Sequence, residues 1–146
     1  MIVYLDMCVL KRPFDDQTQP RIALEAAAGI AIVQAAEAGR LRAVRSVAHE
    51  VENARNPDRR RTGAVQVWLD TLNALEPGSV VQERARELVA EGFRPLDALH
   101  LAWAEHLRAE VFLSTDDRLI SKSHRMEDRI RVRVMDPVAF VRENDL

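Results

Sequence analysis

The sequence has a single cysteine, Cys8, and no uninterrupted hydrophobic run long enough to cross a membrane. One cysteine excludes an internal disulfide, and the first residues lack the basic segment of a signal peptide, so we expect a cytoplasmic protein. The longest apolar stretch, Ile22–Ala36, contains Glu25, Gly29 and Gln34 and falls short of the ~20 residues that span a bilayer. A membrane protein and a disulfide scaffold are therefore excluded.

Lysine and aromatic residues are also scarce. Only Lys11 and Lys122 among the 21 basic residues are lysines, and aromatic residues make up 5% of the chain. The net charge of −2 argues against a uniformly basic surface that coats nucleic acid. It still allows a focused acidic site within a mildly basic surface. The abundant arginines suit phosphate, because the guanidinium donates two hydrogen bonds at once.

The length of 146 residues suits one domain, and the sequence shows no repeat, linker or low-complexity segment. Short apolar runs predict strands at Ile2–Leu5, Leu41–Arg45, Val111–Leu113 and Val132–Met135, with a small strand at Val80–Val81. Helical spacing and capping residues predict helices over Arg21–Ala38, Val47–Arg55, Glu83–Ala90, from Asp58, from Pro95, between Asp117 and Glu127, and from Pro137. This alternation favours an open parallel sheet covered by helices on both faces.

Acidic side chains follow the predicted strands and open one predicted helix. Asp6 comes after the first strand, Asp116 and Asp117 follow the strand at Val111–Leu113, and Asp97 lies in the first turn of the helix begun by Pro95. Ligands of such sheets bind beyond the carboxyl ends of the strands. Carboxylates gathered there repel one another unless they are protonated or bind cations. Because no cysteine and histidine cluster is present, oxygen ligation predicts Mg²⁺ or Mn²⁺ rather than zinc.

A further acid comes from the helix that follows Ser46, where Glu50 and Glu52 are both candidates. The two side chains point about 200° apart around a helix, so only one of them can face the site. If the buried face consists of Val47, Ala48, Val51 and Ala54, each glutamate lies at one edge of it. Geometry alone leaves the choice between them open.

Three segments together resemble a known family. Val3–Leu10, Pro95–Ala102 and Phe112–Asp117 are similar to the first, third and fourth motifs of PIN-domain nucleases, and their order and spacing agree over the entire chain. The resemblance implies an α/β fold with a three-layer α/β/α sandwich around a central parallel sheet, as a single PIN-like domain over residues 1–146. It also implies a nuclease that uses Mg²⁺ or Mn²⁺.

The resemblance also implies which residues form the site. The second acid of the family usually follows a Ser or Thr by six residues, which selects Glu52 from Ser46. The fourth motif is normally Thr-x-Asp, which maps to Thr115 and Asp117 and leaves Asp116 as a neighbour. The implied metal ligands and catalytic acids are Asp6, Glu52, Asp97 and Asp117, with the Thr115 hydroxyl orienting a carboxylate or a water. Met7 departs from the Ser or Thr that commonly follows the first aspartate, which removes a supporting hydroxyl, and Cys8 is interpreted as a small buried residue.

Within this family the resemblance is to VapC-type toxins, which implies an endoribonuclease that cuts RNA, forms a homodimer and is inhibited by a cognate antitoxin. The basic residues that could steer an RNA backbone form two clusters: Arg55, Arg59, Arg60 and Arg61, and Arg118, Lys122, Arg125 and Arg129. For both clusters, a solvated helix face is the alternative. We assign no catalytic role to His49, His106 or His124, with His100 as the possible exception because it follows Asp97 by one turn.

Other functions remain open at this point. A PIN scaffold without catalysis would act as an RNA- or protein-binding module. A phosphatase-like α/β protein would need a second aspartate where Cys8 stands, and a receiver-like protein would need a lysine near a late strand, whereas Lys122 lies inside a predicted helix. The segment Arg12–Asp16 fits a specificity or dimer loop, and a rigid turn explains it equally well.

Overall fold

Four short strands form one parallel sheet in the computed structural model, which describes all 146 residues. The strands are β1 (Ile2–Leu5), β2 (Arg42–Val44), β3 (Val111–Leu113) and β4 (Arg133–Met135), in the order β2-β1-β3-β4. In this register Tyr4 is paired with Val44 on one side and with Phe112 on the other. The chain thus leaves β1 toward β2 and later returns on the opposite side of β1, at β3. The expected parallel sheet is confirmed.

Helices connect and cover the strands. They are α1 (Met7–Lys11), α2 (Pro20–Glu37), α3 (Val47–Arg55), α4 (Arg59–Leu69), α5 (Ser79–Ala90), α6 (Pro95–His106), α7 (Asp117–Arg125) and α8 (Pro137–Glu143), with a 3₁₀ turn η1 at Arg12–Phe14. The short α1 and η1 were not predicted, because five and three residues are too few for an apolar period to show. None of the helices combines the length and the hydropathy that a membrane span requires.

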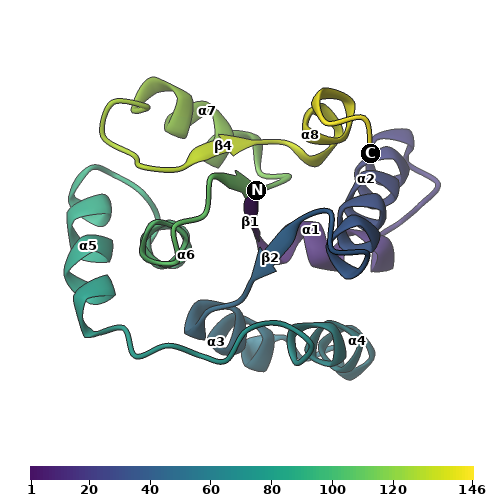
Figure 1. Ribbon diagram of the computed structural model, residues 1–146, viewed down its shortest axis with the longest axis horizontal. Helices are drawn as coiled ribbons and strands as arrows, with labels where there is room; N and C mark the ends of the chain where they lie inside the picture. Colours follow the sequence, from purple (N-terminus) through teal and green to yellow (C-terminus); the bar gives the residue numbers. More distant parts are fainter.

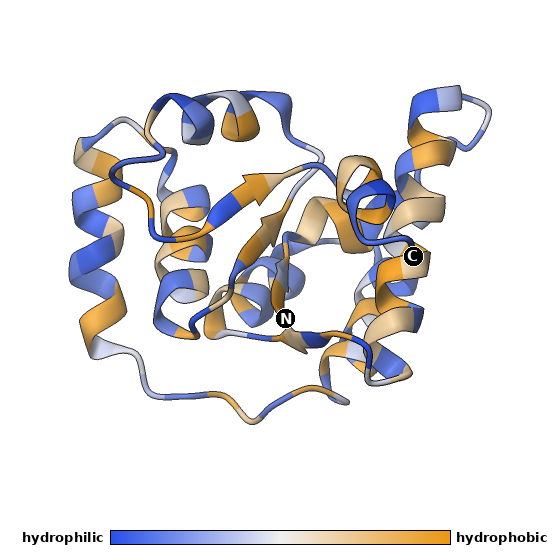
Figure 2. Cartoon of the chain, turned by 45° about the horizontal axis from the view of Figure 1, so that its top comes forward, coloured by the Kyte–Doolittle hydropathy of each residue, from blue (hydrophilic) through white to orange (hydrophobic).

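Successive side chains of a strand lie on opposite faces of the sheet, and the two faces pack against different helices. Val3 and Leu5 pack in one cluster with Ile32 of α2 and Phe140 of α8. Tyr4 points to the opposite face, into the larger cluster with residues of α3, α5, α6 and α7. The helices lie on both sides of the sheet in Figure 1, and Figure 2 shows the strands coloured mainly as hydrophobic. The expected three-layer α/β/α arrangement is therefore present.

The small strand expected at Val80–Val81 is wrong, because both residues lie in α5. Val81 is buried there together with Ala85 and Leu88, four and seven residues further on, while Val80 is 70% exposed. This spacing places the buried residues on one face of a helix. Two adjacent valines are therefore part of a helical pattern that is visible only over a longer window.

The expected buried face of α3 is also wrong in part. Ala48 is buried as expected, but Val47 is exposed, and the polar residues His49 and Asn53 are buried instead. His49 is accommodated because its Nε2 donates to the Leu5 carbonyl at 2.8 Å and its Nδ1 accepts the Ser46 N–H at 3.0 Å. Burial, reinforced by the neighbouring imidazole of α6, lowers the pKa of His49 to about 3 and keeps it neutral.

Candidate active site

Asp6 is buried directly after β1, beside the neighbouring strand β3. Its Oδ2 accepts a hydrogen bond from the Ser114 hydroxyl at 2.7 Å and one from the Cys8 thiol at 3.2 Å. The Ser114 oxygen also accepts the backbone N–H of Asp116 at 3.1 Å. Sequence reasoning missed Ser114, although its place immediately after a buried strand at the same edge of the sheet is a usable signal. These contacts fix the position of the Asp6 carboxylate.

The two residues after Asp6 have different environments. Met7, which departs from the Ser or Thr common after the first aspartate of the motif, is fully buried against Val65 and Leu69 of α4. The hydroxyl that supports Asp6 comes from the adjacent strand instead. Burial, together with the nearby Asp6, raises the pKa of the Cys8 thiol well above its ordinary value. Cys8 is therefore a protonated hydrogen-bond donor and is not a nucleophile.

Glu52 extends from α3 toward the same edge of the sheet. Lys11 Nζ lies 3.0 Å from its Oε1, and His100 Nε2 lies 2.8 Å from its Oε2. Burial by itself would raise the pKa of Glu52, but the hydrogen bonds and charges of His100 and Lys11 outweigh it and lower the pKa to about 2. The donor atoms of Asp6, Glu52 and His100 all lie within 4.8 Å of one another. Glu52 is thus an ionised carboxylate beside Asp6.

Glu50 points elsewhere, and its Oε1 lies 3.4 Å from the Arg45 guanidinium. The two glutamates are separated by two residues of one helix, so they cannot share a direction. Of the two candidates, Glu52 is the one that the structure brings to Asp6.

His100 holds Glu52 in place from the buried interior. The imidazole is 1% exposed, and its Nδ1 lies 2.7 Å from the Tyr4 hydroxyl, which is also 2.7 Å from the hydroxyl of Ser46. Because the Glu52 carboxylate carries no proton, His100 Nε2 donates the hydrogen bond between them. Both ring nitrogens are engaged in this way. We therefore interpret His100 as a positioning residue for Glu52, and its spacing from Asp97 was the signal in the sequence.

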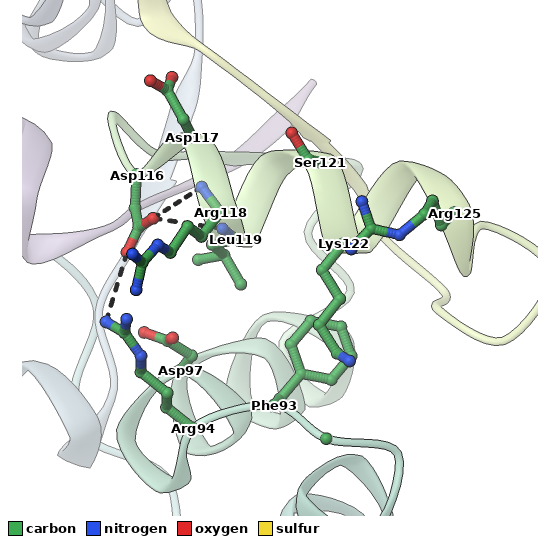
Figure 3. A pocket seen from close by; sticks show the side chains of 11 residues that line it. Phe93, Arg94, Asp97, Asp116, Asp117, Arg118, Leu119, Ser121, Lys122 and Arg125 are labelled. Carbon is green, nitrogen blue, oxygen red and sulfur yellow. Dashed lines mark hydrogen bonds and ion pairs between the residues drawn. The ribbon is translucent and has the colours of Figure 1, made fainter.

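Asp97 lies in the first turn of α6, half-buried and close to other acids. Burial, followed by the charges of Asp6 and Asp116, raises the pKa of Asp97 to about 6, although Arg94 and His100 oppose this effect. Figure 3 shows the side chains of Asp97, Asp116 and Arg94 converging, and the Arg94 guanidinium lies 4.0 Å from Asp116. The charges of Asp6 and Asp116 thus disfavour ionisation of Asp97, and this repulsion adds to the larger effect of burial.

Asp117 is not brought to this group. Its side chain is 66% exposed and forms a two-pronged ion pair with Arg21 of α2 at 2.6 and 2.8 Å. In Figure 3 it points away from Asp97, whereas Asp116 points toward it. Thr115 is buried between the strand and α7, and its backbone N–H donates to the Cys8 sulfur at 3.3 Å.

The segment Arg12–Asp16 is held by a chain of ion pairs. Arg12 pairs with Asp15 at 3.2 Å and with the buried Glu25 of α2 at 2.6 Å. Glu25 also binds Arg21 at 2.7 Å, and Arg61 of α4 reaches Asp15 at 2.9 Å. These contacts hold the segment as a turn that is linked by ion pairs to both α2 and α4.

Comparison with known proteins agrees with this geometry. Residues 3–124 match the family profile of the PIN domain, which is well over half of the chain. The chain belongs to the PIN domain family. PIN domains are generally nucleases that depend on Mg²⁺ or Mn²⁺. No curated protein and no solved structure matches the sequence.

The donor set of this PIN domain fits a divalent cation. Asp6 and Glu52 offer carboxylate oxygens within 4.8 Å of one another, and the repulsion by Asp6 and Asp116, which adds to burial in raising the pKa of Asp97, is the kind that a cation relieves. Because the nitrogens of His100 are already engaged in hydrogen bonds, the available donors are oxygens. Such a set suits Mg²⁺ or Mn²⁺.

The two basic clusters of the PIN domain have different surroundings. In the first, Arg61 is neutralised by Asp15 and Asp58, while the other three arginines are without ion pairs. In the second, Arg129 is neutralised by Glu91 at 2.7 Å. The remaining members of the second cluster line a cleft that also contains Asp97, namely Arg118, Lys122 and Arg125.

Proposed function

We propose that this PIN domain is a Mg²⁺- or Mn²⁺-dependent endoribonuclease that hydrolyses phosphodiester bonds. The observation that carries the proposal is that Asp6 and Glu52 offer donor atoms within 4.8 Å of one another, while Asp97 lies close enough to Asp6 and Asp116 for their charges to add to burial in raising its pKa. We assign the fourth acid to Asp116, in place of the expected Asp117, because the Asp117 carboxylate is held by Arg21.

Asp6 and Glu52 would hold the divalent ion, with Asp97 and Asp116 beside them. When bound, such an ion would supply activation of a water for attack on the phosphodiester and neutralisation of charge on the leaving oxygen. Ser114 keeps one oxygen of Asp6 oriented by its 2.7 Å hydrogen bond. Such outer hydrogen bonds fix the direction of ligand oxygens.

The second proposed ligand, Glu52, is also held by neighbouring side chains. His100 and Lys11 keep Glu52 ionised and oriented. Thr115 would orient a carboxylate or a water through its hydroxyl.

RNA is the proposed substrate, and the toxin of a toxin–antitoxin pair is the proposed biological role. Both follow from the resemblance to VapC-type proteins, together with the family match. A cognate antitoxin and a homodimer are the corresponding proposed partners. Induced expression of the chain should arrest growth, and co-expression of a small protein from the adjoining reading frame should restore it. Growth that is unaffected by expression would contradict the toxin role while leaving the nuclease proposal standing.

The nuclease activity is tested with purified protein and a labelled RNA. We expect cleavage with Mg²⁺ or Mn²⁺, no cleavage in EDTA, and no cleavage by Asp6→Asn at any metal concentration. Circular dichroism of the variant should match the wild type, which separates loss of chemistry from loss of fold. Failure of the wild-type protein to cut any RNA, with metal uptake absent by calorimetry, would favour the alternative of a PIN scaffold that only binds RNA or protein.

A further inference from the structure

A cleft of about 460 Å³ opens beside the acidic centre, between the start of α6 and the length of α7. Asp97 and Asp116 lie at one end of it in Figure 3, and Lys122 and Arg125 lie toward the other. We infer that this cleft binds the backbone phosphates of a nucleic acid strand next to the bond that is cut. The inference rests on the proposed nuclease function and names the surface that holds its substrate.

Charge is the first argument. Arg118, Lys122 and Arg125 line the cleft, and none of them forms an ion pair with a carboxylate of the protein. Two acids of the same lining, Asp116 and Asp117, are paired with Arg94 and Arg21 instead. Positive side chains that share a hollow without acidic partners attract an anionic ligand. Nearby Arg129 lacks this property because Glu91 neutralises it at 2.7 Å.

The spacing of the three cations is the second argument. They occupy positions i, i+4 and i+7 of α7, which places them in a row on one side of the helix. At 1.5 Å per residue the row extends over about 10 Å. A linear row of cations leading from the acidic end of the cleft suits an extended polyanion better than a single small anion.

Lys122 rests against neighbouring residues without a ligand. Its Nζ lies 5.1 Å from the centre of the Phe93 ring, which allows a cation–π contact. It also lies over Gly92, where an added Cβ would come within 2.8 Å of Nζ and where φ is 96°. A side chain already confined in this way loses less conformational entropy when it binds phosphate.

The cleft offers contacts to phosphate and none for stacking on bases. Phe93 is its only aromatic lining residue and is 4% exposed, beneath Lys122. Without an exposed ring, base stacking cannot contribute here. We therefore expect the cleft to contribute affinity that is independent of sequence. An acidic protein segment would be the competing ligand, but the row of cations ends at carboxylates that would repel such a segment.

The inference is tested by RNA binding to the full chain carrying Asp6→Asn, which suppresses cleavage. Labelled oligonucleotides of different sequence are titrated by fluorescence anisotropy over a range of salt concentrations. Lys122→Ala should weaken binding about 5-fold at 0.1 M salt for every sequence and lower the slope of log Kd against log salt by about 0.7, the value for one phosphate contact on a single strand. Lys122→Arg should retain most of the affinity.

Arg129→Ala is the matched control, because it removes a neutralised cation from the segment just after α7. It should leave affinity and salt slope unchanged, and thermal melting should show that Lys122→Ala is folded. Unchanged binding by both Lys122→Ala and Arg125→Ala would overturn the inference. So would displacement of the RNA by a polyglutamate peptide at lower concentration than by unlabelled RNA.

The two proposals fail in different ways. If wild-type protein cuts RNA but Lys122→Ala cuts it with the same KM at every salt concentration, the cleft assignment is wrong and the nuclease proposal stands. If wild-type protein cuts no RNA while Lys122→Ala shows the lower salt slope, the cleft binds nucleic acid and the nuclease proposal is wrong.

Discussion

Replacing Asp97 by asparagine should stabilise the metal-free protein while it abolishes nuclease activity. Burial, with help from Asp6 and Asp116, raises the pKa of Asp97 from 3.8 to about 6. At ~1.4 kcal/mol per pKa unit the shift corresponds to about 3 kcal/mol of destabilisation by the ionised carboxylate. Because the side chain is partly exposed and solvent screens its charge, we expect a gain of about 1–2 kcal/mol in the free energy of unfolding at pH 8.

The gain in stability of Asp97→Asn over wild type should increase with pH. A raised pKa means that folded protein keeps the Asp97 proton at a pH where the unfolded chain has lost it. The destabilisation of the folded protein by ionised Asp97 is therefore absent below about pH 4. It grows between about pH 4 and 6 and is fully present above about pH 6. Asparagine is neutral throughout, so the difference between variant and wild type should follow the same curve.

Urea unfolding in EDTA, at about pH 4 and about pH 8, measures this difference. The control is Asp128→Asn, which removes an exposed carboxylate that has no ion pair. Added Mg²⁺ should then stabilise the wild type more than Asp97→Asn, because a ligand stabilises the form that binds it. The reasoning would be refuted if Asp97→Asn were no more stable than wild type at pH 8. It would also be refuted if the gain in the free energy of unfolding were the same at both pH values.

Five further substitutions test the site and the buried network beside it. Glu52→Gln should lower the rate of RNA cleavage by more than about 100-fold, because loss of a residue that only supports a metal ligand already costs about 10–100-fold. Glu50→Gln should stay within about 3-fold of wild type in the same assay. Asp116→Asn should reduce metal affinity in calorimetry and Asp117→Asn should not; the opposite result would restore the original assignment of the fourth acid. Tyr4→Phe removes the partner of the buried His100 Nδ1 and one of the partners of the Ser46 hydroxyl. Urea unfolding should show a loss of about 1–3 kcal/mol in the free energy of unfolding, and an unchanged midpoint would contradict the buried network.

The sequence by itself determined the architecture of this PIN domain. Buried apolar runs that end in carboxylates and alternate with helical patterns are sufficient for an open parallel sheet. Since the carboxyl ends of parallel strands share one edge, the same pattern predicted a site at the ends of the strands that precede Asp6 and Asp116. Asp97 followed from a helix start signal at Pro95. These features depend on residues that are close together in the sequence, so they can be predicted from the sequence alone.

The tertiary structure decided which polar atoms meet, because each of these contacts joins residues far apart in the chain. Ser114 reaches Asp6 only because β3 pairs with β1, and His100 reaches Glu52 only because α6 and α3 pack on the same face of the sheet. Adjacent residues at a helix start point in different directions, so contact with Arg21 decided the position of the Asp117 side chain. No pattern of local spacing contains that information, since hydrogen bonds and ion pairs are selected by the partners that folding brings within reach.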